Sequence, residues 1–206
     1  MARRDASTPR TPNFRDWRAA VLHPPGPVAE ALQRQLARLS IQTRILWPDL
    51  DAAGAEADVV FFDADLGHDQ QFPWPAGGAP MPTVALVGSE APGRLEWALA
   101  QRPCAHMTKP VGSGGVYSAL VIASHAFAER RALQQDIAAL SARLKGRTVV
   151  ARALARLMAE RGLDDAAAMR LLRGEAMDRG RTLEDQASAL LAGPEAAARD
   201  RGGRRP

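Results

Sequence analysis

Arginine is the residue type whose abundance and placement in this sequence point most directly to a chemistry. Of the 27 basic residues, 25 are arginine, and the two lysines are Lys109 and Lys145. The guanidinium group is a planar, forked donor suited to phosphates and bases. From Ser141 onward there are 14 basic against 9 acidic residues, so the positive charge is concentrated at the C-terminal end. A GC-rich genome also produces an arginine bias, and this explanation stays open beside the functional one.

The other chemically versatile side chains form no catalytic or metal-binding pattern. The single cysteine, Cys104, excludes an internal disulfide and a cysteine-based zinc site. The segment Gly112–Gly115 lacks the lysine of a phosphate-binding loop and the spacing of a nucleophile elbow. The four histidines lack metal-site spacing: His23, His68, His106 and His125. We therefore predict that the protein is not an enzyme and takes no cofactor or metal.

The elements in the first half of the chain alternate between short apolar segments and helical segments. Leu32, Leu36 and Leu39 repeat at helical spacing, and a second helix is expected over residues 94–101. Residues 49–57 are expected to form a short helix and 65–82 a loop rich in proline and glycine. Strands alternating with helices predict a doubly wound α/β domain with a parallel sheet. The predicted strands are residues 19–23, 42–47, 58–63, 83–87 and 104–108.

A long helix is predicted after this domain, because residues 116–161 contain no proline and only Gly146 as a glycine. Such a helix would measure about 70 Å. The residues Ala126, Arg130, Leu133, Ile137, Leu140 and Leu144 fall at alternating steps of four and three, which is coiled-coil spacing. Dimerisation through Leu133, Ile137, Leu140 and Leu144 is the favoured interpretation. The alternative is a helix that folds back on its own sheet.

Two further helices are predicted at the C-terminal end. Gly162 ends the long helix, and Asp164 is the expected N-cap of a helix that runs to Arg179. Thr182 and Asp185 have capping-box spacing at the start of the last helix, which stops near Gly193. We expect a core formed by apolar residues of all three helices: Leu157, Met158, Met169, Leu172, Met177, Leu183 and Leu190.

The segment VVARALARLMAERGLDDAAAMRLLRGEAMDRGRTLEDQASALL resembles the ANTAR domain, a three-helix RNA-binding module of bacterial antiterminators. The agreement lies in Leu157-Met158, the Asp-Asp-Ala start, Leu171 to Arg173 and Ala176-Met177. The basic residue that the family often has at position 154 is replaced by Leu154. From about Ala19 to Leu191 the chain resembles the AmiR-like antiterminators, which have a flavodoxin-like pseudo-receiver domain, a coiled-coil helix and an ANTAR module.

The same resemblance bears on phosphorylation. Asp63 matches the phosphoacceptor position of receiver domains, and Lys109-Pro110 matches their fifth strand end. The first strand ends in His23 rather than in the carboxylates that would hold Mg²⁺, and Gly88 replaces the expected hydroxyl residue. We therefore interpret Asp63 and Lys109 as a vestigial site that forms a structural ion pair.

The resemblance implies an RNA-binding transcription antitermination regulator that acts on leader mRNA hairpins. It also implies control by sequestration, through a negative regulator of the periplasmic-binding-protein type (AmiC-like). Two alternatives stay open: a response regulator phosphorylated on Asp63, and a dimeric interaction protein that binds no nucleic acid. The arginines that we expect to contact phosphates and bases are Arg147, Arg152, Arg156, Arg170, Arg173, Arg179 and Arg181.

The predicted organisation has five parts, and the protein is expected in the cytoplasm with no membrane association. The N-terminus carries five arginines and no apolar stretch that could be a signal peptide. The parts are a flexible tail (1–18), a receiver-like domain (19–115), a coiled-coil dimerisation helix (116–146), an ANTAR domain (147–193) and a disordered tail (194–206).

Overall fold

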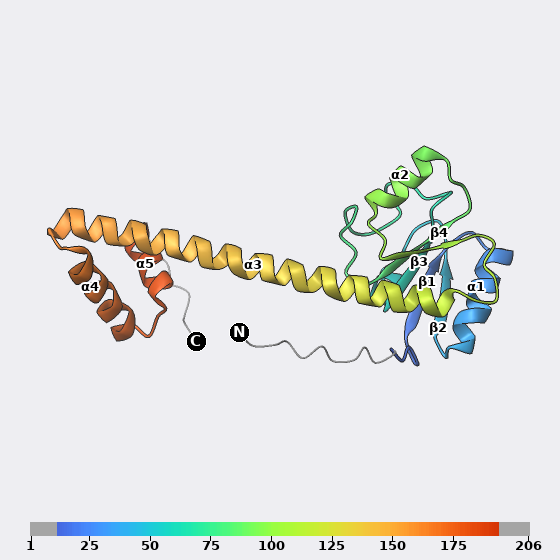
Figure 1. Ribbon diagram of the computed structural model, residues 1–206, viewed down its shortest axis with the longest axis horizontal. Coiled ribbons are helices and arrows are strands. Elements are labelled where there is room, and N and C mark those ends of the chain that lie inside the picture. Colours follow the sequence, from blue (N-terminus) through green and yellow to red (C-terminus); the bar gives the residue numbers. More distant parts are fainter. Residues whose placement is uncertain (1–11, 194–206) are drawn as a thin grey trace, which may run out of the picture. The chain divides into compact units, whose positions relative to one another are not determined.

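The structure is a computed structural model that describes residues 12–193 (Figure 1). The chain divides into two compact units, and the boundary falls between Ala132 and Leu133, within helix α3 (Val116–Arg161). The predicted C-terminal tail, 194–206, lies outside the described residues, as do residues 1–11 of the predicted N-terminal tail.

The first unit contains a parallel five-stranded sheet. Its strands are β1 (Arg18–Leu22), β2 (Gln42–Leu46), β3 (Val59–Asp63), β4 (Thr83–Val87) and β5 (Ala105–Thr108), in the order β2-β1-β3-β4-β5. Each strand begins and ends within one residue of its predicted bounds. This order is that of flavodoxin-like folds, so the predicted fold class is confirmed.

Alternate residues of the strands enter two separate apolar cores, as the pleat of a sheet requires. Val21 and Phe61 face α1 (Pro27–Arg38) and the first turns of α3, which cover one side of the sheet (Figure 1). Leu22 and Phe62 face the other side, where α2 (Pro92–Ala100) and the chain after β3 cover them. The sheet is therefore wound on both faces.

The connections that precede and follow β3 contain little regular secondary structure. The short helix expected over residues 49–57 is a single 3₁₀ turn, Gly54–Glu56. The expected loop at 65–82 contains no helix or strand, and Phe72 in it packs edge-on against Phe62, with ring centroids 5.4 Å apart. Aromatic packing therefore replaces a helix on this part of the sheet.

The N-terminal segment joins the core earlier than predicted. Phe14 is 3% exposed and packs edge-on against Trp17, with ring centroids 4.8 Å apart, and β1 begins at Arg18. The prediction of a flexible tail through residue 18 missed this packing, because Phe14 and Trp17 are isolated aromatic residues in a polar stretch without periodicity.

The second unit consists of α3 from Leu133 onward, α4 (Asp165–Asp178) and α5 (Leu183–Ala192). The predicted caps are present: the Asp164 carboxylate accepts from the Ala167 amide at 2.7 Å, and the Thr182 hydroxyl oxygen accepts from the Asp185 amide at 3.1 Å. Gly162 and Gly180 follow their helices with φ of 63° and 59°, a conformation that favours glycine.

The core of this three-helix module differs from the predicted one at two methionines. Leu157 and Leu172 are buried as expected, but Met158 is 38% exposed and Met177 is 81% exposed. The core alanines Ala153, Ala168 and Ala187, and the buried Ala176, fill inward positions instead, which lets the helices approach closely. Met177 follows the inward Ala176 by one residue and therefore points outward.

Within residues 12–193, no helix is both long and apolar enough to cross a bilayer.

Candidate nucleic-acid interface and the carboxyl-edge site

The carboxyl ends of β1, β3 and β5 bring three charged or polar side chains together. The Lys109 ammonium lies 2.8 Å from Oδ1 of Asp63, so the predicted pair is in contact. Asp63 is 1% exposed. His23, which follows β1, has its Nε2 atom 3.2 Å from Oδ2 of Asp63, but the two atoms are out of line for a hydrogen bond and both are buried. The His23 Nδ1 atom lies 2.7 Å from the Pro24 carbonyl, to which it can only donate.

A second carboxylate, Asp65, completes this carboxyl-edge site and was missed in the sequence. Its Oδ2 atom lies 2.6 Å from the Lys109 ammonium, and its carboxylate accepts from the backbone amides of Gly88 and Ser89 at 2.9–3.1 Å. A Cβ atom at Gly88 would lie 2.6 Å from Oδ2 of Asp65, so a hydroxyl residue at this position would require the Asp65 side chain to move. The sequence did offer one signal for Asp65, because it is a second carboxylate two residues after Asp63 at the end of a predicted strand.

The electrostatics of the site follow from one cation between two anions. Burial opposes the charge of Lys109, but the two carboxylates outweigh it and raise the pKa of the ammonium. Burial likewise acts to raise the pKa of Asp65, but the hydrogen bonds from Lys109, Ser89 and Gly88 outweigh it and lower that pKa. Both groups are therefore held in their charged forms.

This donor set does not fit the Mg²⁺ that phosphoryl transfer to an aspartate requires. Mg²⁺ prefers several oxygen ligands in octahedral geometry. Here the Lys109 ammonium lies between the two carboxylates, and a histidine ring occupies the end of β1. No group of three metal-ligating side chains exists among residues 12–193. The Lys109 ammonium supplies the positive charge that balances these two carboxylates.

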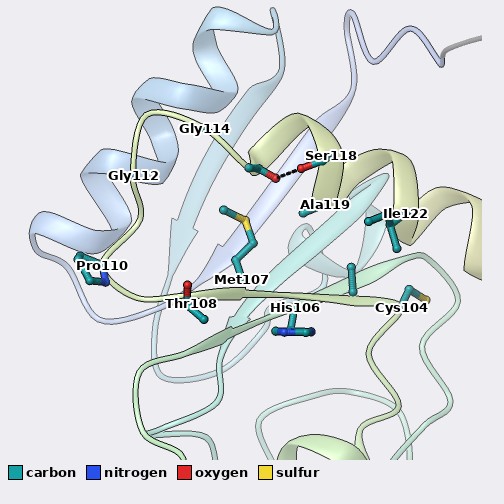
Figure 2. Close-up of a pocket in the computed structure, with 12 residues that line it drawn as sticks. Cys104, His106, Met107, Thr108, Pro110, Gly112, Gly114, Ser118, Ala119 and Ile122 are labelled. Carbon is teal, nitrogen blue, oxygen red and sulfur yellow. Dashed lines mark hydrogen bonds between the residues drawn. The ribbon is translucent and has the colours of Figure 1, made fainter.

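A pocket of about 510 Å³ lies beside β5, between that strand and the first turns of α3 (Figure 2). Met107 projects from β5 towards this side, and Ser118, Ala119 and Ile122 line the pocket from the helix. The loop at Gly112–Gly115 borders it, and the Ser118 hydroxyl donates to the Gly115 carbonyl at 2.9 Å. The lining contains no lysine, arginine or carboxylate, so it has no charged side chain for a phosphate, and Cys104 and His106 are too few to hold a metal ion by themselves.

The second unit holds all seven arginines predicted to bind RNA, and two of them are engaged within the module. Arg156 pairs with Glu160 at 2.7 Å and donates to the Leu190 carbonyl at 3.1 Å, so it ties α3 to the end of α5. Arg179 pairs with Glu175 at 3.0 Å. These two side chains are therefore partly neutralised, and only Arg156 connects two helices.

The other five arginines are exposed and have no carboxylate within 4 Å among residues 12–193: Arg147, Arg152, Arg170, Arg173 and Arg181. Leu154, where the ANTAR pattern often has a basic residue, is 8% exposed and part of the module core. A charged group at this position would be difficult to accommodate here, so the cationic surface comes from the exposed arginines.

The apolar seam predicted for dimerisation is exposed. Leu133, Ile137, Leu140 and Leu144 are 62–68% exposed, far more than large aliphatic side chains usually are. Arg130, which interrupts the pattern, donates from Nη1 to the Arg102 carbonyl at 2.9 Å within the first unit. The first turns of α3 pack on the sheet, which agrees in part with the alternative of a helix that folds back on its own sheet. The four seam residues are exposed and take no part in this packing.

Comparison with known proteins accounts for both units. Residues 17–124 match the family model described as "AmiR, N-terminal", and residues 138–191 match the ANTAR domain model. The chain is 32% identical over 182 residues to the aliphatic amidase regulator of Pseudomonas aeruginosa, which covers 87% of this chain and 93% of that protein. It is 30% identical over 110 residues to the transcriptional regulatory protein PdtaR of Mycobacterium tuberculosis, covering 53% of this chain and 54% of that one.

Solved structures of response regulators are also similar. The response regulator StyR matches with a TM-score of 0.45 and 14% identity over 85% of this chain and 98% of that chain. The receiver domain of a modulated diguanylate cyclase from Desulfovibrio desulfuricans G20 matches with a TM-score of 0.43 and 16% identity, over 53% of this chain and 94% of that one. From the two family models and the full-length relative, the chain belongs to the AmiR-like transcription antiterminators, with an AmiR N-terminal domain followed by an ANTAR domain.

Proposed function

We propose that this protein binds hairpins in the leader of a nascent mRNA in the cytoplasm and prevents a terminator from forming. The observation that carries the proposal is the set of five exposed arginines without carboxylate partners in the described part of the ANTAR module. Guanidinium groups bind phosphates and base edges, and RNA sequence is read mainly in loops and unpaired bases. A compact helical module with such a surface is suited to a hairpin loop.

The test is binding to the leader RNA of the operon that encodes the protein, measured by gel shift at several salt concentrations. We expect tighter binding to the leader hairpin than to a hairpin of the same composition with a scrambled loop, and affinity that falls as salt rises. Equal affinity for both hairpins would reject sequence-selective antitermination. No RNA binding at any salt concentration would support the alternative of a dimeric interaction protein.

We further propose that a partner protein, rather than phosphorylation, controls the receiver-like unit. Asp63 is almost fully buried, and its Oδ1 atom accepts from both Lys109 and the Asp65 amide, each at 2.8 Å. An attacking carboxylate must instead be accessible to the phosphodonor and accompanied by Mg²⁺. By family resemblance, the partner is a ligand-sensing, AmiC-like protein of the periplasmic-binding-protein type, which sequesters the regulator until the inducer binds.

Intact-mass measurement separates these two modes of control. After incubation with a small-molecule phosphodonor and Mg²⁺, the wild-type protein should show no mass increase corresponding to a phosphoryl group. A stoichiometric increase that disappears in Asp63→Asn would favour the phosphorelay alternative. Release of leader RNA on addition of the purified partner, reversed by the inducer, would support sequestration.

A further inference from the structure

The outward face of α4 carries an unusual combination of residues. Ala168, Leu172 and Ala176 point into the module core, so Arg170, Arg173, Gly174 and Met177 share the opposite face of this helix. These four residues, called the α4 outer face below, are all exposed, and Met177 is 81% exposed. A large thioether side chain exposed to water on the same face as two cations has no structural role in the described part of the protein.

The acidic residues of α4 leave the positive charge of this face in place. Glu175 points the other way, where its Oε2 atom accepts from Arg179 at 3.0 Å and from the Gln186 amide group at 2.7 Å. Gln186 is 4% exposed, so this contact is fixed inside the module. Asp178 borders the α4 outer face but lies within 4 Å of no basic group among residues 12–193.

Gly174 is a second feature that packing does not explain. A glycine within a helix destabilises it relative to alanine. At Gly146 the reason is visible, because a Cβ atom there would lie 2.9 Å from Cγ of Glu184 on α5. At Gly174 an added Cβ atom would meet nothing within 4 Å, so the described protein offers ample room for a side chain. The absence of a side chain instead leaves the helix backbone open to close approach from outside.

We propose that the α4 outer face is the part of the ANTAR module that meets the RNA loop, an inference that rests on the proposed function. Arg170 and Arg173 contact phosphates, Gly174 lets the RNA backbone approach the helix, and Met177 packs against an unpaired base. A second copy of this chain is disfavoured as the occupant, because a two-fold contact would place these arginines against their own copies. The face therefore fits a polyanion with exposed bases.

Gly174→Ala provides the sharpest test, since stability and binding should change in opposite directions. The substitution should raise the Tm of the protein slightly, because alanine favours the helix, and should weaken leader-hairpin binding measured by fluorescence anisotropy. Gly174→Leu should weaken it further. The control is Ser188→Leu, which adds bulk at an exposed position of α5 and should leave affinity unchanged. Unchanged affinity for Gly174→Ala and Gly174→Leu would overturn the close approach.

The other residues give distinct readouts. Arg170→Ala with Arg173→Ala should make the slope of log affinity against log salt shallower by about two, because two phosphate contacts are lost. Met177→Ala should weaken binding roughly tenfold with the salt dependence unchanged, because an apolar contact is lost. Arg143→Ala, at an exposed arginine of α3 outside the seven predicted RNA-binding residues, is the matched control and should leave affinity and salt dependence unchanged.

The outcomes also separate this inference from the function on which it rests. If wild type selects the leader hairpin but Arg152→Ala weakens it while the α4 variants do not, the inference fails and the function stands. If wild type does not discriminate between hairpins, the proposed function fails. A change in sedimentation of Met177→Ala with RNA affinity retained would assign the face to a protein contact and overturn the inference.

Discussion

At the carboxyl edge of the sheet, one lysine ammonium satisfies two carboxylates that would otherwise be buried without a counter-charge. Asp63 and Lys109 were identified in the sequence through the resemblance to receiver domains, whose phosphoacceptor and fifth-strand positions they match. His23 was noted only as a missing carboxylate, and Asp65 was missed. Its role depends on the path of the chain after β3, where the Gly88 and Ser89 amides meet its side chain.

Lys109→Met should destabilise the first unit strongly. The Lys109 side chain is 14% exposed, and its removal leaves Asp63 and Asp65 as neighbouring charges in a buried site. Breaking such a pair costs roughly 3–5 kcal/mol. Chemical denaturation measures the loss. Arg34→Met, which removes only an exposed ion pair with Glu30, is the control and should cost at most about 1 kcal/mol. A similar small cost for both variants would contradict the account.

Asp65 predicts a pH dependence with a defined sign. Its pKa is lower in the folded protein than the ordinary value of 3.8, so its contribution to stability is present above pH 3.8 and is lost as pH falls through the folded value. Asp65→Asn should therefore flatten the decline in the free energy of unfolding below pH 3.8. Glu30→Gln, at an exposed carboxylate, should leave that decline as in wild type. An unchanged slope in Asp65→Asn would show that this carboxylate does not contribute.

At the scale of elements, α3 combines two kinds of surface. Its first turns bury Val116, Ala119 and Leu120 against the sheet, whereas its seam is exposed in the single chain. The bounds and caps of the helices and the positions of the strands were predictable, because apolar periodicity, prolines, glycines and capping residues are local signals in the sequence. The outward positions of Met158 on α3 and Met177 on α4 were not predictable, because they depend on how closely the helices approach, and alanines fill part of the space between them.

Charge placed in the seam should prevent dimerisation. We expect wild type to sediment as a dimer and Ile137→Asp with Leu140→Asp to sediment as a monomer, because each buried aliphatic side chain contributes about 1.5–3 kcal/mol. Ala139→Asp introduces one such charge at an exposed position outside the seam and should leave the dimer intact. Analytical ultracentrifugation distinguishes the two. A dimeric double variant would place the contact between copies elsewhere.

In the whole molecule, we expect the ANTAR module to recognise RNA, the receiver-like unit to respond to a partner protein, and the helix that they share to provide avidity. Sequence resemblance supplied this organisation, while the structure supplied the identity of the exposed arginines. These roles predict that a weaker dimer lowers the affinity for RNAs with two hairpins more than the affinity for RNAs with one.

A dimer has two ANTAR modules, so a leader with two hairpins should bind more tightly than one with a single hairpin. Effective concentration raises such binding by roughly 10²–10⁴. The seam variant Ile137→Asp with Leu140→Asp should lose this advantage and keep its affinity for a single hairpin, whereas Ala139→Asp should keep both. Fluorescence anisotropy with the two RNAs measures the difference. A seam variant that retains the two-hairpin advantage would show that avidity does not depend on this helix.

The most direct measurement is single-round transcription through the leader of the operon that encodes this protein, with the fraction of full-length transcript as the readout. The account predicts that wild-type protein increases read-through of the terminator. It also predicts that Arg170→Ala with Arg173→Ala fails to do so although the protein remains folded. Unchanged termination in the presence of wild-type protein, or an equal increase on a leader with scrambled hairpin loops, would contradict it.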